Sequence, residues 1–295
     1  MGKEPLVVGL GELLWDVFPE GKKLGGAPLN FTYHCVQLGA QGQAVSALGA
    51  DADGEEIRRI LESKNLPDTY VQADPDHPTG RVNVTLEAGK PSYEICRDVA
   101  WDHIRLEENL RDLATRADAV GFGSLAQRSP LSRATIHAFL EAMRPAALRI
   151  FDVNLRQNFF SKEILTASLQ RANVLKLSDE ELPTLANDFG LTGDPIDQLH
   201  ALRQMFDLRL VAFTRGGQGS VLVTAEETSD HPGLPTTVQD TVGAGDSFTA
   251  TLCIGLLKKR SLGEINQKAS QVAAFVCSQA GATPLLQREH LYHES

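Results

Sequence analysis

Asp240-Thr-Val-Gly-Ala-Gly-Asp246-Ser-Phe-Thr249 is the stretch of this chain that decides its fold. Two closely spaced glycines, Gly243 and Gly245, precede Asp246, and an apolar pattern with helical spacing follows. Glycine lets the backbone approach an anion without a clash at Cβ, and the start of a helix offers unpaired N–H donors and the positive end of the helix dipole. The stretch therefore predicts a helix N-terminus that binds phosphate.

The acid at this helix start has two interpretations. A carboxylate held beside a bound phosphate can accept the proton of an attacking hydroxyl. Aspartate is also a common cap of helix N-termini, and for a bare Gly-x-Gly-Asp the capping role is the more frequent one. The ten residues alone leave both roles open for Asp246.

Composition limits the class of partner. The chain has 295 residues, 42% hydrophobic and 22% charged, which is ordinary for a globular protein. Its net charge of −10 argues against nucleic acid as a partner, because a phosphate backbone requires a basic surface. No apolar run reaches the roughly 18 residues that a membrane span needs, so we expect no membrane partner.

The cysteines and the N-terminus indicate a location. Cys35, Cys96, Cys253 and Cys277 are far apart in the sequence, which fits neither a disulfide framework nor a zinc site. Cys253 and Cys277 lie in apolar helical patterns, so we expect both to be buried. Met1-Gly-Lys-Glu-Pro5 lacks the apolar core of a signal peptide. We expect a cytoplasmic protein.

Short apolar runs alternate with helical patterns along most of the chain, which predicts an α/β fold with a central, mostly parallel sheet flanked by helices in three layers. The predicted strands are Leu6–Leu10, Ala119–Phe122, Arg149–Val153, Val174–Leu177 and Leu210–Phe213. The predicted helices include Asn30–Leu38, Glu55–Ser63, Leu131–Met143 and Ile196–Met205.

Two segments, residues 12–25 and 79–98, have a different pattern. Val82, Val84 and Leu86 alternate with polar residues, and Ala88-Gly89-Lys90-Pro91 supplies a turn. We expect a small antiparallel β-sheet lid built from these two insertions. No linker or internal repeat divides the chain, so residues 1–295 are expected to form one domain.

The stretch from Asp240 to Asp246 resembles the C-terminal signature of the ribokinase family of carbohydrate kinases, the phosphofructokinase B type. Further motifs of that family follow in its order along nearly the whole chain: Gly25-Gly26-Ala27-Pro28-Leu29-Asn30, Asp152-Val-Asn154-Leu-Arg156, Asn173 to Glu181, and Thr214 to Gly219. The resemblance implies a ribokinase-like fold with a β lid. It also implies ATP and Mg²⁺ as cofactors.

The resemblance places the sugar against the lid. It implies that Gly25, Gly26 and Asn30 contact sugar hydroxyls, with Asp16 as an acid that grips them. Ribokinases typically carry a lysine after the paired glycines, whereas this chain has Ala27-Pro28-Leu29, which is closer to fructokinases. Arg97 ends Ser92-Tyr93-Glu94-Ile95-Cys96-Arg97, and branches of the family that act on sugar acids use a tyrosine and an arginine in this area. Ordinary surface residues of a lid strand explain the segment equally well.

The resemblance also assigns nucleotide and metal residues. Those implied at the nucleotide are Lys176, Ser178, Thr214, Gly216, Gly219 and Thr241. Glu181 would order magnesium through water, although Ser178 replaces the asparagine that usually accompanies it. Asp240 and the backbone of Val242 lie where many members bind K⁺, although Leu285 stands where a serine is usual.

The function implied is an ATP-dependent sugar kinase, and the fructokinase features favour D-fructose, giving fructose 6-phosphate. Asp246 would be the base, the amides of Ala244, Gly245 and Asp246 would surround the phosphate in the catalytic turn that Gly243 begins, and Arg156 would neutralise its charge. A kinase for another sugar or sugar acid, such as ribose or 2-keto-3-deoxygluconate, stays open, as does a sugar-binding regulator without catalysis. Edge strands of the lid favour a homodimer through it.

Overall fold

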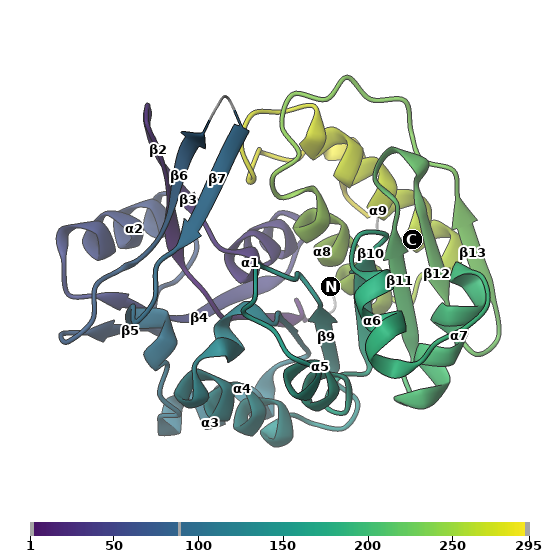
Figure 1. Ribbon diagram of the computed structural model, residues 1–295, viewed down its shortest axis with the longest axis horizontal. Coiled ribbons are helices and arrows are strands. Elements are labelled where there is room, and N and C mark those ends of the chain that lie inside the picture. Colours follow the sequence, from purple (N-terminus) through teal and green to yellow (C-terminus); the bar gives the residue numbers. More distant parts are fainter. Residues whose placement is uncertain (1–2, 88–89, 293–295) are drawn as a thin grey trace.

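A nine-stranded sheet forms the centre of the computed structural model, which describes residues 3–87 and 90–292 (Figure 1). The strand order is β13-β12-β11-β10-β9-β8-β1-β4-β5. From β11 to β5 every neighbouring pair is parallel, and β12 and β13 continue antiparallel at one edge. Their bounds are β1 Leu6–Leu10, β4 Gln41–Gly49, β5 Val71–Asp74, β8 Ala119–Phe122, β9 Leu148–Asp152, β10 Val174–Ser178, β11 Leu210–Thr214, β12 Ser220–Val223 and β13 Thr228–His231.

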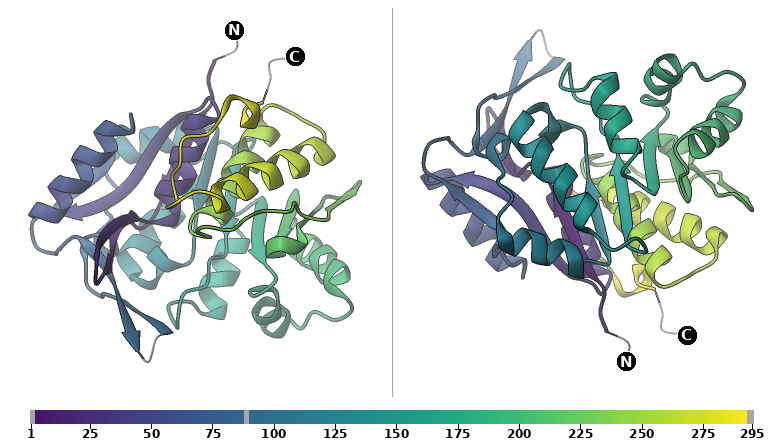
Figure 2. Two further views of the ribbon diagram at one scale, coloured as in Figure 1. Left: turned by 90° about the horizontal axis from the view of Figure 1, so that it is seen from above. Right: turned by 90° about the horizontal axis from the view of Figure 1, so that it is seen from below.

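Helices cover both faces of this sheet, which confirms the three-layer α/β prediction (Figures 1 and 2). One face packs against α1 (Ala27–Gln37), α8 (Ala244–Leu257) and α9 (Leu262–Cys277), with α2 (Ala52–Ser63) beside α1. The other face packs against α3 (Glu108–Arg116), α4 (Pro130–Ala142), α5 (Lys162–Leu169), α6 (Leu182–Phe189) and α7 (Pro195–Met205). Short 3₁₀ helices are η1 (Ala100–His103), η2 (Leu125–Arg128), η3 (Gly216–Gln218) and η4 (Arg288–His290).

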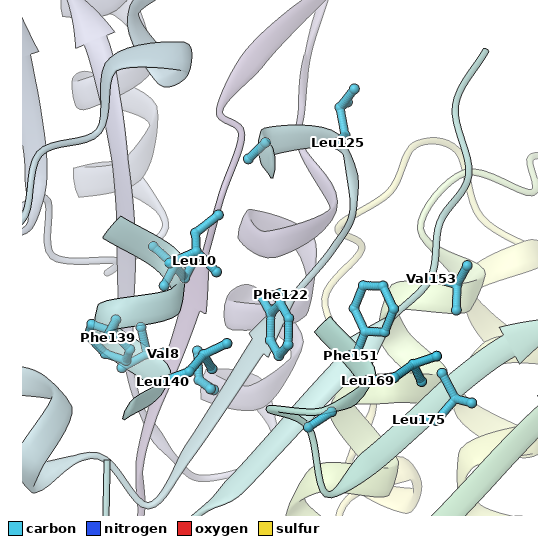
Figure 3. Close-up of a cluster of buried hydrophobic side chains, with 14 of the residues drawn as sticks. Val8, Leu10, Phe122, Leu125, Phe139, Leu140, Phe151, Val153, Leu169 and Leu175 are labelled. Carbon is cyan, nitrogen blue, oxygen red and sulfur yellow. The ribbon is translucent and has the colours of Figure 1, made fainter. Parts of the chain in front are cut away.

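The core follows from the apolar runs of the central strands. Side chains of a strand alternate between the faces, so in β1 Val7 packs with the α1–α8 side and Val8 with the α4 side. Figure 3 shows the cluster on the α4 side, to which Val8 belongs. In it Phe122 and Phe151 stack with ring centroids 5.3 Å apart. A strand that is apolar on both sides belongs in the middle of a sheet covered by helices.

A separate four-stranded sheet forms the lid, in the order β3-β2-β6-β7. Its strands are β2 Leu14–Phe18, β3 Gly21–Gly25, β6 Gly80–Glu87 and β7 Lys90–Ile95. Both predicted insertions therefore contribute, and the alternating pattern is observed where Val82 and Val84 are buried. The sheet is not antiparallel throughout as expected, because β2 and β6, which join the two insertions, pair in parallel. Of the predicted turn, Ala88 and Gly89 lie outside the described residues, and Lys90 and Pro91 belong to β7 instead.

Some sequence expectations differ from the structure. The apolar patterns did not reveal β4, because its sequence, Gln-Gly-Gln-Ala-Val-Ser-Ala-Leu-Gly, is poor in β-branched and aromatic residues. The helix predicted over Asn30–Leu38 begins earlier, at Ala27, since Pro28 is tolerated in a first turn. Assignment of both sheets to one domain, residues 1–295, stays a proposal.

All four cysteines are free thiols. Cys253 is buried as expected, but Cys277 is only half-buried, because it is the last residue of α9. No helix in the described part of the chain is long and apolar enough to cross a membrane. The cytoplasmic location stays a prediction.

Candidate active site

The N-termini of α1 and α8 meet at a hydrogen bond between side chains. Asn30, in the first turn of α1, donates from Nδ2 to Oδ2 of Asp246 over 2.8 Å. Asp246 lies in the first turn of α8, where N–H groups have no acceptor within the helix. Among the described residues, Oδ1 of Asn30 is buried without a hydrogen-bond partner. Two residues that are 216 positions apart thus share one site, with an acceptor left over for a ligand.

Gly243 gives α8 its sharp entry. It is the N-cap, with a left-handed φ of 79°, and a Cβ there would lie 2.5 Å from the carbonyl oxygen of Ala282. Of the predicted phosphate-binding amides, that of Ala244 already donates to Thr241 O over 3.3 Å. The amides of Gly245 and Asp246 belong to the same first turn, so they suit an anion.

The electrostatics of Asp246 fit a proton acceptor. Part of its surface reaches solvent, yet protein atoms surround it, and burial raises its pKa to about 6. The nearby carboxylate of Asp152 raises the pKa further, while Asn30, Lys176 and Arg156 oppose these effects. A base with a pKa close to neutrality is well matched to accepting a hydroxyl proton.

Glu12 belongs to the same group of charges, and the sequence patterns did not identify it as a site residue. It directly follows Gly11 after β1, is 3% exposed, and has a pKa raised by burial to about 7. The charge of Arg156 lowers this pKa and that of Asp246 raises it, so the three groups interact electrostatically. Within the described chain Oε2 of Glu12 is buried and unpartnered. Its position after a central parallel strand is the signal that could have revealed it.

Asp16 and the paired glycines lie beside this group. Burial raises the pKa of Asp16 to about 6, and Arg156 and Lys23 lower it. A Cβ on Gly25 would lie 2.4 Å from Asp16 Oδ2, so only glycine leaves room for this carboxylate. A Cβ on Gly26, whose φ is 120°, would lie equally close to the carbonyl oxygen of Glu12. The predicted sugar-binding motif therefore folds around two acids.

Arg156 stands on an unusual loop after β9. Asn154 and Gln157 both have left-handed backbones, with φ of 44° and 48°, and such strain is characteristic of functional loops. Gln157 Nε2 donates to Tyr93 O of β7 over 2.6 Å, which ties the loop to the lid. Arg156 itself is exposed, and its charge acts on Glu12, Asp16 and Asp246 alike.

Lys176 is buried, whereas a side chain that binds a nucleotide is expected to reach solvent. It is buried beneath the start of α8, where its Nζ donates to Asp152 Oδ1 over 3.0 Å. The other oxygen of Asp152 accepts from Thr249 of α8 at 2.9 Å. A Cβ on Gly245 would lie 3.1 Å from the Lys176 Nζ. The pair anchors the helix start, and a role of Lys176 at the nucleotide stays a prediction.

Glu181 joins two loops at the edge of the sheet. Its Oε2 accepts the amide of Ser178 at 2.7 Å, and its Oε1 accepts the amide of Leu155 at 3.0 Å. Carboxylate oxygens suit magnesium, which keeps several of its waters. Because both oxygens already accept amides, Glu181 would hold a magnesium ion through water rather than directly, and this role stays a prediction.

The predicted nucleotide loop follows β11. Thr214 ends that strand, and Gly216, with φ 51°, opens η3 in a place where a Cβ would meet nothing within 4 Å. Gly219 has φ 89°, and a Cβ there would collide with His231 O, so its glycine is required by the fold itself. Thr241 is exposed ahead of α8. Contact of this group with ATP stays a prediction.

The residues predicted for K⁺ come together. Asp240 accepts the amide of Val242 through Oδ1 at 3.0 Å and the amide of Gly281 through Oδ2 at 3.1 Å. His34 of α1 contacts Ala282 O over 2.9 Å, and burial lowers the pKa of His34 to about 4, so the neutral ring donates. The turn at 280–282 is thereby held against Asp240.

Arg97 lies just after β7. It is exposed, and its guanidinium is 4.9 Å from the Phe159 ring centroid. Phe159 closes the loop that carries Arg156, because its amide donates to Arg156 O over 3.0 Å. Arg97 therefore borders the loop, and its contact with a sugar stays a prediction.

Comparison with known proteins gives one family over nearly the whole chain. Residues 11–288 match the pfkB family of carbohydrate kinases. A fructokinase of Salmonella typhimurium is 29% identical over 259 residues, covering 84% of this chain and 83% of its own length. An Escherichia coli fructokinase is 28% identical over 304 residues, covering 97% of each chain.

Solved structures agree. An uncharacterized sugar kinase from Pyrococcus horikoshii is 30% identical, with a TM-score of 0.83 over 94% of this chain and 93% of that one. The same kinase has also been solved in complex with ATP. A fructokinase from Xylella fastidiosa with bound ATP has a TM-score of 0.83 at 21% identity, covering 96% of this chain and 94% of its own, which shows a shared fold.

Proposed function

Because the chain belongs to the pfkB family of carbohydrate kinases, we propose that it phosphorylates D-fructose on the 6-hydroxyl with ATP as the donor. The observation that carries a kinase reaction is the Asn30–Asp246 contact, which holds a carboxylate of raised pKa at a helix N-terminus. The fructose assignment is supported by the Gly-Gly-Ala-Pro-x-Asn motif and by the relatives named fructokinase.

In the proposed reaction, Asp246 accepts the proton of the sugar hydroxyl while its oxygen attacks the γ-phosphorus of ATP. The bond from the γ-phosphorus to the bridging oxygen breaks, and ADP leaves with that electron pair. The first-turn amides of α8 and the Arg156 guanidinium stabilise the charge on the transferring group. Magnesium, when bound, supplies further neutralisation of phosphate charge, with Ser178 and Glu181 to hold its waters.

The remaining predicted residues have supporting roles. Asp16, Gly25, Gly26 and Asn30 would orient the sugar, and positioning of this kind supplies a large part of phosphoryl-transfer catalysis. The lid would exclude water, which otherwise competes with the sugar as acceptor. Thr214, Gly216, Gly219 and Thr241 would hold ATP, and K⁺ at Asp240 and Val242 would fix the turn before α8.

The test is ADP release from magnesium-ATP with D-fructose, ribose, 2-keto-3-deoxygluconate and other sugars, with the Asp246→Asn variant alongside. We expect fructose to be the best substrate and the variant to lose at least about 10²-fold in kcat, the usual contribution of a positioned base. Fructose and ATP binding should be largely retained, because asparagine still accepts from Asn30.

The matched control is Asp112→Asn, an exposed aspartate on α3 that pairs with Arg116. It should retain full activity. Near-normal turnover of Asp246→Asn would contradict its role as base. Turnover of a different sugar would keep the mechanism and discard fructose, and silence across the panel would favour the regulator without catalysis.

We also propose that two copies associate through the lid. Its outer strands, β3 and β7, are the edges of an open sheet, which commonly pair with another chain. Tyr93 of β7 is 55% exposed, unusual for a large aromatic residue. An aromatic side chain on an open edge is typical of a protein interface.

A further inference from the structure

A cluster of metal-ligating side chains lies at the base of the lid, and none of its three residues has a role in the proposed kinase reaction. His77 comes shortly before β6, and Asp98 comes shortly after β7. His103 ends η1, the 3₁₀ helix that follows. The three residues therefore join the two ends of the β6–β7 hairpin to the body of the protein.

Their ligand atoms converge. The Nε2 atom of His103 lies 3.0 Å from Asp98 Oδ1, and Nε2 of His77 lies 3.7 Å from the same oxygen. All three ligand atoms are within 4.8 Å of one another. An ion that binds nitrogen and oxygen at about 2.0–2.2 Å needs neighbouring ligands roughly 3–3.5 Å apart. The two distances from Asp98 Oδ1 are already close to that range, and the side chains have to rotate to bring all three atoms into it.

A buried acid prepares His77 as a ligand. Asp74 is 4% exposed, and its Oδ2 lies 3.0 Å from Nδ1 of His77. The other oxygen of Asp74 accepts the amides of Asp76 and His77. An ionised carboxylate can only accept, so Nδ1 carries a proton, and Nε2 is the ring nitrogen that faces the cluster. Metal-binding histidines commonly have this kind of carboxylate partner.

The rings of His77 and His103 are stacked, with centroids 3.5 Å apart and planes 10° from parallel. Parallel rings aim their lone pairs side by side, so a shared ion requires them to open by rotation about χ2, which is a soft torsion. Both rings are partly exposed, at 22% and 24%. Asp98 and His103 also border an open pocket of about 260 Å³.

We propose that His77, Asp98 and His103 form a site for one first-row transition metal ion such as Zn²⁺. Two imidazoles and one carboxylate suit Zn²⁺, Cu²⁺, Ni²⁺ or Co²⁺, whereas Mg²⁺ and Ca²⁺ take oxygen ligands. The site is therefore independent of the magnesium implied for ATP. An ion here would fasten both ends of the β6–β7 hairpin to η1.

The experiment measures binding of Zn²⁺ to the full chain, prepared without a histidine tag and stripped with a chelator, by competition with a chromophoric chelator. We expect one ion per chain. His77→Ala and His103→Ala should each weaken binding at least about 10-fold, and Asp74→Asn about 10-fold through the orientation of His77. His200→Ala is the control, because His200 lies on α7 at the other end of the sheet and should bind as the parent does.

Cu²⁺ provides a second measurement, because its electron paramagnetic resonance spectrum reports coupled nitrogens. Two imidazole nitrogens are expected in the parent and one in each histidine variant. Thermal unfolding of each variant in the presence of a chelator checks that it is folded without metal. If His103→Ala is unfolded, His103→Gln replaces it. Unchanged Zn²⁺ affinity in both histidine variants, no binding by the parent, or a Cu²⁺ spectrum without two nitrogens would overturn the site.

Discussion

Three carboxyl groups around Arg156 have raised pKa values, Asp246 and Asp16 at about 6 and Glu12 at about 7. Burial is the first cause for each of them. Ionising such a group inside the protein is unfavourable, so each negative charge in the site has a cost in free energy. Hydroxyl groups that donate hydrogen bonds to these carboxylates would relieve this, as those of a bound sugar would.

Activity should therefore depend on pH on the acid side. Asp246 must be ionised to accept a proton, so kcat/KM for the sugar is expected to fall as pH drops through about 6. Asn30→Ala should move this limb to higher pH, because its donated hydrogen bond lowers the pKa of Asp246. Rates measured from about pH 5 to 9 at constant ionic strength check both, and a profile that stays flat over the acid half of that range would contradict the assignment.

The raised pKa of Glu12 affects the stability of the fold, which should fall as pH rises. Its folded-state pKa of about 7 exceeds the ordinary 4.5, so the folded state binds more protons and its stability falls as pH rises between those values. Glu12→Gln should therefore raise the free energy of unfolding at about pH 8 by about 1–3 kcal/mol. The gain should vanish near about pH 4, where the acid is protonated in both states. Urea unfolding at the two pH values measures it, and equal gains at both would refute the ionisation argument.

The residue types and their order predicted much of this site, including Asp246, Asn30, Asp16 and Arg156. They could not reveal Glu12 or the burial of Lys176. Whether an acid or a lysine is surrounded by protein depends on packing between distant segments, such as Asp152 and Thr249 around Lys176. No spacing within one segment encodes that.

At the scale of elements, the entry into α8 determines where Asp246 and its neighbouring amides lie. The left-handed Gly243 and the carbonyl of Ala282 fix this turn, and His34 of α1 holds Ala282 from behind. A change at the turn should therefore displace the first turn of α8, which carries Asp246.

Gly243→Ala should lower the free energy of unfolding by about 2–4 kcal/mol, through its positive φ and the contact with Ala282 O. It should also lower kcat by roughly 10²-fold, because about 1 Å of misplacement has that effect. Gly263→Ala in α9 is the control, since nothing lies within 4 Å of its Cβ, and it should stabilise by about 0.5–1 kcal/mol. Thermal melts and steady-state rates test the pair, and equal behaviour of the two variants would be inconsistent with a strained turn.

The elements themselves followed from the sequence where apolar runs were continuous, as in β1 and β8, whose predicted bounds match. β4 was missed although it is nine residues long. It is stabilised by pairing with β1 and β5 on either side, so its alanines, glycines and glutamines need little propensity of their own. Tertiary pairing overrides local preference there.

At the scale of the whole molecule, the lid adds to the α/β body a second sheet whose edge strands, β3 and β7, are open. If two copies pair through it, the solution mass measured by light scattering should be about twice the chain mass of 32.0 kDa. Tyr93→Lys should shift the protein toward monomer, because a charge on a sheet edge opposes pairing. A parent that is monomeric at micromolar concentration would exclude the lid dimer.

The order of strands in the large sheet also constrains how the chain matures on the ribosome. β1 is made first and soon gains β4 as a partner, but its other neighbour, β8, begins only at Ala119. The lid strands, complete by Ile95, are all synthesised before that second neighbour exists. During that interval one edge of β1 has unpaired backbone N–H and C=O groups, and contacts this distant in sequence form slowly. We therefore expect chaperones to bind nascent chains that are halted between Ile95 and Ala119.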